Sequence, residues 1–364
     1  MRVAMIDGSA PTSDRSDLAR SAAQVDQKDN LPTLRKGALT SSHIVRWCAA
    51  QENWDKIHYD DKFARDVGRL PGPIINGALK QHFIVQFLEN GFGLDAWIWR
   101  IDYKFIGIDL VGQEVEVRGS VADSSVKGDL IFFVVDVAIW NRNLNQATTV
   151  GEAVVVVHRR RRRIRSADEF FSATDKFQLD ESIAGSSGAV PPAVAASIGK
   201  VLEEGRSVVP VDLSRLRLFA DAVMGLDTRY FDSNGGDVVA PPLFPLHGIK
   251  QAPGARPLST DPGAFGREGV HEVGRNVAIQ FGLDPTGMLN GGNKVQIHSL
   301  AKLGEYLAAE STLASAKERF GARGGRMLVV ETLNRYREAT TGRLLITERQ
   351  TVIYRFSHEE ESRG

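Results

Sequence analysis

The sequence predicts an α+β protein built from two fused domains, each an antiparallel sheet curled around one central helix. Three observations support this prediction. With 364 residues, the chain is long enough for two domains that each bury a core. A helix-like segment precedes strand-like runs twice along the chain. A short polar segment around residue 55 recurs 172 positions later with part of its pattern kept.

The first domain is expected over residues 31–158, after an N-terminal extension, residues 1–30, that is too polar to form a core and is expected to be disordered. Apolar residues at helical spacing predict a short helix over 39–48 and a second helix over 78–88, after the break Pro71-Gly72-Pro73. The second helix is apolar enough to be wrapped by a sheet. Strand-like runs follow at residues 97–106, 115–121, 130–140 and 149–157.

The remainder of the chain repeats this organisation. The expected parts are a linker (159–211), a second domain (212–357) and a tail (358–364). The linker has few order signals and holds one possible helix near 193–204. In the second domain, apolar spacing predicts a helix over 213–224 and strands over 327–336 and 344–356.

The two domains can be aligned residue by residue near their starts. A shift of 172 positions aligns Asp55 with Asp227 and His58 with Tyr230. The same shift aligns Asn53 with Gly225, Trp54 with Leu226, Tyr59 with Phe231 and Asp60 with Asp232. The aromatic and acidic frame is kept while the histidine is lost. We therefore expect a duplicated fold whose second copy has no imidazole at this place.

The segment Asn53–Asp60 combines a carboxylate, an amide and an imidazole within six positions. Histidine exchanges a proton near neutral pH, and a carboxylate three residues away can orient its ring or share a water with it. Asp55 and His58 therefore suit the addition or removal of water, in which a base activates the water and an acid protonates the neighbouring carbon.

Asn76-Gly77, at the start of the second helix, is the candidate place for the negative charge that develops on a carbonyl oxygen in such a reaction. Exposed backbone N–H groups and the helix dipole favour an anion there, and glycine allows a ligand to approach closely. A tight entry into the helix is the alternative explanation for Gly77.

These motifs resemble those of the MaoC-like, R-specific enoyl-CoA hydratases and dehydratases. The resemblance rests on residues 53–64, 70–77, 101–105 and 112–115, and it covers residues 32–158. It implies a hot-dog fold and the reversible hydration of a 2-enoyl-CoA to a 3-hydroxyacyl-CoA, as in fatty acid metabolism, with coenzyme A as part of the substrate and no other cofactor. The site it implies comprises Asp55, His58, Asn53 and Gly77 as catalytic residues and Asn76, Pro73 and Tyr59 as substrate-binding residues.

The chain departs from the family pattern, which is Asp, any residue, Asn, Pro, an aliphatic residue and His. Here the aspartate position is Asn53, the asparagine position is Asp55 and the proline position is Lys56, while His58 keeps its place. Because an amide is no general base, the acid/base carboxylate is expected to be Asp55, with Asn53 holding water or the thioester oxygen.

The second half resembles the partner hot dog of fungal fatty acid synthase dehydratase-like proteins. The matching segments are Val239–Phe244, Leu289–Gly292 and Arg349–Arg355. This resemblance implies two fused hot-dog domains, one catalytic and one shaping the acyl tunnel for a bulky or branched acyl group. The Asn53/Asp55 exchange keeps open a non-catalytic acyl-CoA-binding subunit of a hydratase complex, and a thioesterase on the same fold is a third alternative.

Composition excludes several other classes of protein. The 45 basic and 45 acidic side chains leave no net charge to hold nucleic acid or an anionic membrane, and no apolar stretch reaches the roughly 18 residues of a membrane span. The single cysteine, Cys48, favours a reducing cytoplasm. The sequence contains no metal-ligand cluster, phosphate loop, dinucleotide fingerprint or nucleophile elbow. The sequence is compatible with a homodimer and does not decide the oligomeric state.

Other polar and aromatic residues have simpler explanations. His82, on the apolar face of the second helix, is expected to be a core or interface histidine, whereas His247 and His298 are expected on surface loops. The run Arg159–Arg163 suits a solvated face better than a grip on the phosphates of coenzyme A. The aromatic residues expected to pack in the core are Trp97, Trp99, Tyr103 and Phe105.

Overall fold

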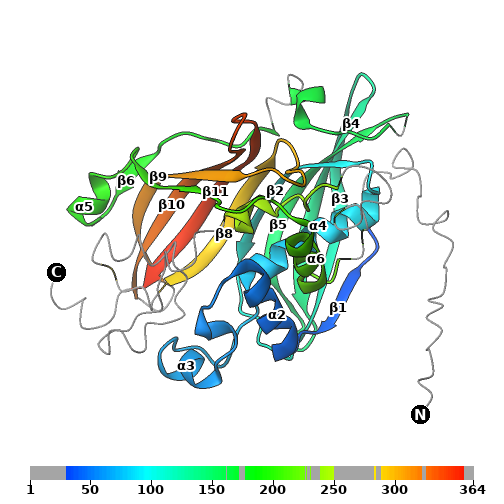
Figure 1. Cartoon of the computed structure of the whole chain (residues 1–364). Coiled ribbons are helices and arrows are strands. Elements are labelled where there is room, and N and C mark those ends of the chain that lie inside the picture. Colours follow the sequence, from blue (N-terminus) through cyan, green and yellow to red (C-terminus); the bar gives the residue numbers. More distant parts are fainter. Residues whose placement is uncertain are drawn as a thin grey trace, which may run out of the picture.

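The computed structural model describes residues 30–160, 162–171, 177–225, 227, 230, 238–249, 283, 288–321 and 325–355. Almost all of the expected N-terminal extension and the whole expected tail lie outside these residues, as do Leu226, Phe231 and Asp232 of the aligned repeat. Within the described residues, one continuous sheet of 11 strands carries the fold (Figure 1).

The first half runs from a short edge strand through helices to four long antiparallel strands. Its elements are β1 (Leu34–Ala38), α2 (Ser41–Gln51), the 3-10 turn η2 (Lys56–His58), α3 (Asp61–Asp66), α4 (Gly77–Phe92), β2 (Trp97–Phe105), β3 (Glu114–Lys127), β4 (Leu130–Asn141) and β5 (Gln146–His158). The predicted central helix is therefore α4, and the four predicted strands are confirmed as β2 to β5. The expected core aromatics Trp97, Trp99 and Tyr103 are buried.

The second half has more strands than the sequence predicted. After the 3-10 turn η3 (Ala167–Glu169), its elements are β6 (Gly185–Ser187), α5 (Pro192–Ala195), β7 (Val201–Arg206), α6 (Leu213–Ala222), α7 (Pro245–Gly248), β8 (Met288–Ile297), β9 (Leu307–Phe320), β10 (Arg326–Glu338) and β11 (Leu344–Arg355). The predicted helix over 213–224 and the two predicted strands are confirmed as α6, β10 and β11, but β8 and β9 were not predicted.

The possible helix over 193–204 is wrong beyond its first turn. The helix ends at Ala195, and residues 201–206 form β7, which pairs antiparallel with β9. Backbone hydrogen bonds to a strand about 100 residues further along the chain decide this conformation. Residues 201–206, which were expected to lie in the linker, thus belong to the sheet of the second half, whereas the predicted domain boundaries themselves stay predictions.

The order of strands in the sheet is symmetric about its centre. It reads β1-β3-β4-β5-β2 in the first half and continues as β8-β11-β10-β9, with β7 and β6 both paired to β9. The two halves join where β2 pairs antiparallel with β8, for example at Ile101 and Val295. The fold is therefore two hot dogs that share one sheet through their inner strands (Figure 1).

The duplication extends to local detail, although the shift between the halves is not constant. The N-caps of α2 and α6, Thr40 and Asp212, lie 172 positions apart. Strands β3 and β9, in contrast, begin and end 193 positions apart. Between the helix N-cap and this strand, the second half therefore has 21 more residues than the first half. For this reason the shift of 172, which holds through the polar turn, does not extend to the strands.

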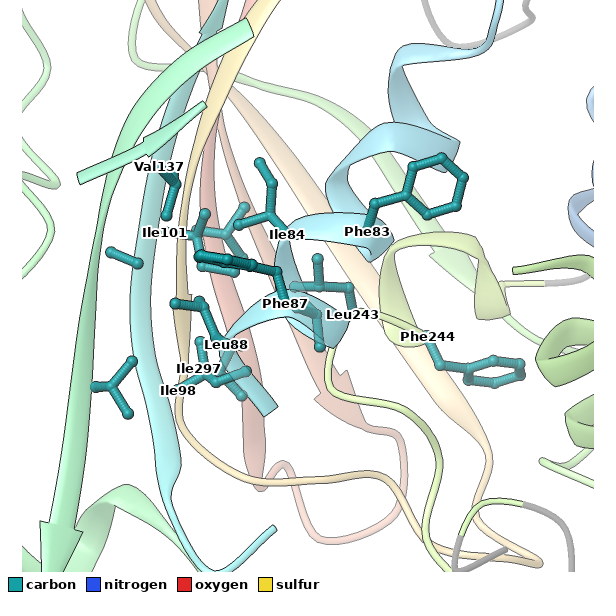
Figure 2. Packing of buried hydrophobic residues seen from close by; sticks show 14 of the residues in the cluster. Phe83, Ile84, Phe87, Leu88, Ile98, Ile101, Val137, Leu243, Phe244 and Ile297 are labelled. Atoms are coloured by element: carbon teal, nitrogen blue, oxygen red, sulfur yellow. The ribbon is translucent and has the colours of Figure 1, made fainter. Parts of the chain in front are cut away.

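Helix α4 lies against the junction of the two halves and supplies much of the core. Its apolar residues are spread around most of its surface, so it is buried on nearly every side. Figure 2 shows Phe87 and Leu88 of α4 near Ile98 and Ile101 of β2 and Ile297 of β8. Because one cluster of buried residues contains all five, the two halves share a hydrophobic core.

Candidate active site

The end of α2 sets the position of the candidate site segment. Glu52 has a left-handed backbone conformation, with φ 60°, and the N–H of Asn53 donates to the carbonyl of Cys48 at 2.9 Å. The side-chain oxygen of Asn53 then accepts the N–H of Asp55 at 3.0 Å. Asn53 therefore shapes the turn that carries Asp55, in the way that asparagine side chains commonly do.

Asp55 and His58 lie at the two ends of one 3-10 turn. Asp55 is the N-cap of η2, and its carboxylate accepts the N–H of Ile57 at 3.2 Å, while the N–H of His58 donates to the carbonyl of Asp55 at 3.2 Å. Both residues are buried, with 6% and 8% of their surface exposed. Asp55 caps this turn in an extended conformation, and His58 closes it, so the turn holds the two residues at its opposite ends.

The backbone of Ile74 fixes the orientation of the His58 ring. His58 Nδ1 lies 2.9 Å from the carbonyl oxygen of Ile74. Since a carbonyl only accepts hydrogen bonds, Nδ1 is the protonated nitrogen, and in the neutral ring Nε2 has the lone pair. His58 is thus held in the tautomer in which Nε2 can accept a proton.

A short extended strip, residues 73–75, connects this turn to the start of α4. On one side, the N–H of Ile74 donates to the carbonyl of Ile57 at 3.0 Å. On the other side, the N–H of Ile75 donates to the carbonyl of Asp109 at 2.8 Å, and the N–H of Val111 donates to the carbonyl of Pro73 at 2.9 Å. The half-buried Pro73 lies in this strip, so the strip holds both the His58 ring and the entrance to α4 in fixed register.

Asn76 and Gly77 begin α4, as predicted. Asn76 is 1% exposed, and its side chain makes no capping hydrogen bond to the first turn. Its Nδ2 instead lies 3.9 Å from Cys48 Sγ, and its Oδ1 has no hydrogen-bond partner. The N–H groups that open an α-helix have no partner within the helix, so this end of α4 offers donors to an anionic oxygen.

Gly77 is required by its contact with an aromatic ring. A Cβ at this position would lie 2.7 Å from the ring of Phe105, which is closer than real Cβ atoms approach. The steric explanation for this glycine is therefore sufficient by itself. It does not conflict with an anion at the same helix end, because the close packing involves the Cα and leaves the N–H in place.

Cys48 and Tyr59 complete the surroundings of Asp55. Burial raises the pKa of the Cys48 thiol to about 11, and the nearby Asp55 carboxylate acts in the same direction. Burial also raises the pKa of Tyr59, whose hydroxyl donates to the carbonyl of Trp54 at 2.8 Å. Both groups are protonated at neutral pH. The contact of Cys48 with Asn76, 28 residues away, had no local signal in the sequence.

The second half has a different residue in place of the imidazole. Tyr230 is the counterpart of His58, and its N–H donates to the carbonyl of Asp227 at 3.3 Å, as in the first turn. Its buried hydroxyl donates to the carboxylate of Glu89 on α4. The predicted loss of the titratable ring from the second copy is thus accompanied by a tyrosine that ties the second half to the central helix.

Three further histidines of the described residues, His82, His247 and His298, pack against aromatic side chains. His82 is a core residue, as predicted, with its ring centroid 5.2 Å from that of Trp47. The expectation of surface loops for His247 and His298 is wrong. His247 Nε2 lies 3.1 Å from Gln81 Nε2, and the His298 ring lies 5.5 Å from that of Trp99. Both rings therefore pack within the structure instead of pointing into solvent.

The arginine run after β5 makes exposed ion pairs. Arg160 pairs with Asp129 at 3.7 Å and Arg162 with Glu169 at 2.8 Å, while Arg161 lies outside the described residues. These pairs agree with the solvated face that the sequence favoured over phosphate binding. Among the residues that the structure describes, no group of three or more His, Cys, Asp or Glu could hold a metal ion.

Two hot dogs on one sheet, joined through their inner strands, define a double hot-dog protein. Residues 10–111 match a family model described as hydroxyacyl-thioester dehydratase type 2. Residues 196–346 match a model described as the FAS1-like dehydratase domain region. Each match covers less than half of the chain, and together they confirm the predicted resemblance to hot-dog dehydratases in both halves.

Solved structures show the same fold over nearly the whole chain. A MaoC-like dehydratase is 13% identical, with a TM-score of 0.55, and the match covers 93% of this chain and 100% of that one. A putative MaoC domain dehydratase from Chloroflexus aurantiacus is 10% identical, with a TM-score of 0.56 and the same coverage. A Mycobacterium tuberculosis protein described as a double hot dog is 10% identical, with a TM-score of 0.52, 92% of this chain covered and 98% of that one.

These likenesses confirm the predicted fold class. A comparison with curated proteins gave no match. No helix in the described part of the chain is both long enough and apolar enough to cross a membrane.

Proposed function

We propose that the protein catalyses the reversible hydration of a 2-enoyl-CoA thioester to a 3-hydroxyacyl-CoA, with Asp55 and His58 as the acid/base pair. The observation that carries the proposal is the His58–Ile74 hydrogen bond of 2.9 Å, which leaves Nε2 as the proton acceptor in the turn that Asp55 caps. The dehydratase family models that match both halves support the same reaction class.

In the hydration direction, the pair removes a proton from water, and the water oxygen forms a bond to the β-carbon of the enoyl group. The electrons of the carbon–carbon double bond move toward the thioester carbonyl, whose oxygen gains negative charge. The N–H of Gly77 and the dipole of α4 stabilise that oxygen. The acid form of the pair then protonates the α-carbon, so the proton balance closes. Asn53 supports the turn and accepts the Asp55 N–H.

The second half supports substrate binding rather than proton transfer, since Tyr230 stands where a second imidazole would be. The proposal therefore assigns a bulky or branched acyl group to the pair of domains, with Pro73, Asn76 and Tyr59 as substrate-binding residues. A cytoplasmic location, which the single cysteine favours, belongs to the same proposal.

The direct test follows the absorbance of the conjugated thioester after purified protein is mixed with straight and branched 2-enoyl-CoAs. We expect turnover by the wild type and a loss of kcat of about 100-fold or more in His58→Gln, because general acid–base groups typically contribute 10² to 10⁴. His43→Gln is the matched control, since His43 caps α2 through Thr40 and lies outside the proposed site. Equal rates in wild type and His58→Gln would refute the assignment.

A non-catalytic acyl-CoA-binding subunit is the second candidate. One observation favours it, because Asn53 occupies the aspartate position of the family pattern and its side-chain oxygen is already bonded to the Asp55 N–H. Calorimetry with a 3-hydroxyacyl-CoA separates the two candidates. Binding without turnover of any enoyl-CoA favours the subunit, whereas release of free thiol would indicate a thioesterase.

A further inference from the structure

A buried charged network lies behind the strip that joins His58 to α4. Lys80, in the first turns of α4, places its Nζ 2.7 Å from Asp109 Oδ2, and both side chains are almost fully buried, at 4% and 0% exposed. Asp109 also accepts the Nδ2 of Asn141 at 2.8 Å and the hydroxyl of Thr148 at 2.8 Å. Its carboxylate therefore joins α4 to β4 and to β5.

A buried ion pair of this kind is not by itself evidence of added stability. Burying two charges has a desolvation cost that their attraction offsets only when the geometry is good, so buried ion pairs often contribute little net stability. The full set of donors around Asp109 meets that geometric condition. What the network does achieve is a fixed position for Asp109 relative to α4.

The backbone of Asp109 transmits that position to the proposed site. Its carbonyl accepts the N–H of Ile75 at 2.8 Å, and the carbonyl of Ile74, the preceding residue, accepts the proton of His58 Nδ1 at 2.9 Å. Asp109 thus holds, through its side chain, the first turns of α4 and, through its carbonyl, the strip that orients the imidazole.

Phe105 adds a third contact between the same parts. Its ring lies against Gly77, and the Lys80 ammonium lies 4.7 Å from the ring centroid. The start of α4 therefore contacts both an aromatic ring and an ion pair, and Lys80 takes part in both contacts.

We infer that Asp109 is a positioning residue for the proposed hydration, because it sets the separation between the His58 ring and the N–H groups that open α4. The inference rests on the proposed function. The role of Asp109 is to keep the base and the oxyanion donors in register, through its side chain on α4 and its carbonyl on the strip. Misplacement of a reacting group by about 1 Å can cost about 10² in rate.

The kinetic test uses two variants, Asp109→Asn and the charge-neutral double variant Lys80→Met/Asp109→Asn, which leaves no unpaired buried charge. We expect both to lower kcat by about 10- to 100-fold and to change KM by less than about threefold, because binding is kept while transition-state geometry is lost. Glu348→Gln is the matched control. Glu348 is likewise a buried carboxylate with three donors, Asn293, Asn334 and Tyr336, and it makes no contact with the strip at residues 73–75.

A readout that does not need activity is the tautomer of His58, followed by NMR of protein labelled with ¹⁵N-histidine and assigned with His58→Gln. We expect the Nδ1–H form in the wild type and in Glu348→Gln, and a mixture of tautomers in Lys80→Met/Asp109→Asn. An unchanged His58 signal in the double variant, or a kcat within about twofold of the Glu348→Gln value, would overturn the inference. If the tautomer changes while the wild type turns over no enoyl-CoA, the positioning role stands and the proposed function fails.

Discussion

Glu52 and Met224 occupy equivalent positions in the two halves, 172 residues apart, and both have a left-handed backbone conformation, with φ 60° and 55°. Each ends a helix. The next N–H along the chain donates to a carbonyl in the last turn of that helix, at 2.9 Å after Glu52 and at 2.8 Å after Met224. The two halves therefore keep the same helix ending even where their side chains have nothing in common.

Replacing Glu52 by glycine is expected to stabilise the protein. A left-handed conformation costs a residue with a Cβ about 1–2 kcal/mol, and glycine loses part of that gain through its more flexible unfolded chain. We expect Glu52→Gly to raise the free energy of unfolding by about 0.5–1 kcal/mol in urea titrations. Glu52→Ala is the control and should bring no such gain. A glycine variant no more stable than the alanine variant would contradict the explanation.

Replacing Gly77 by alanine is expected to destabilise the protein and to impair the proposed reaction. The new Cβ would lie 2.7 Å from the Phe105 ring, so the ring or the start of α4 must move. Overpacking of this kind typically costs about 1–3 kcal/mol. The melting temperature and kcat should both fall. The double variant Gly77→Ala/Phe105→Leu makes room for the methyl group and should recover most of the stability. No recovery in the double variant would show that the ring is not the obstacle.

Acid is expected to destabilise the fold through His82. Burial lowers the pKa of His82 from 6.5 to about 3. Between these values the unfolded chain binds a proton that the folded chain does not, so the free energy of unfolding falls as the pH decreases below 6.5. One such group contributes up to about 1.4 kcal/mol per pH unit. Unfolding free energies measured from pH 7.5 down to pH 4.5 should show a shallower slope in His82→Phe, and parallel slopes would contradict this assignment.

Cys48 is expected to react slowly with alkylating reagents in the folded protein. It is the only cysteine in the chain, it is fully buried, and burial raises its pKa to about 11. Because the thiolate is the reactive form, alkylation at pH 8 should be at least about 100-fold slower than in the urea-unfolded chain. Mass spectrometry after timed quenching measures both rates. Comparable rates would mean that α2 separates readily from α4 beside Asp55.

Much of the first half could be predicted because its signals are local. The apolar spacing of α4 and the alternation along β2 to β5 indicate the elements without any knowledge of their partners. In the second half, β9 contains Ala308, Ala309, Ala314 and Ala316, a composition that suits a helix equally well. It is a strand because β10 and β7 bond to its two edges, and such pairing is not visible in a short segment.

The candidate site shows the same division. The turn at Asp55 and His58 and the helix start at Gly77 lie within short motifs, so the sequence could predict them. The Lys80–Asp109 pair joins residues 29 positions apart, and the tautomer of His58 depends on a backbone carbonyl 16 positions away. The sequence offered one signal for the pair, a charged residue within each of two apolar stretches. That these two residues are partners could be found only from the fold.

The junction of β2 with β8 has a consequence for how such a protein can change over time. In a dimer of identical chains, every substitution appears twice, so a residue that helps one copy of a site also alters the other. Here one covalent chain provides both copies, and position 58 can keep an imidazole while position 230 has a phenol that grips the central helix. Because the two copies are fused in one chain, each can acquire substitutions that the other does not have.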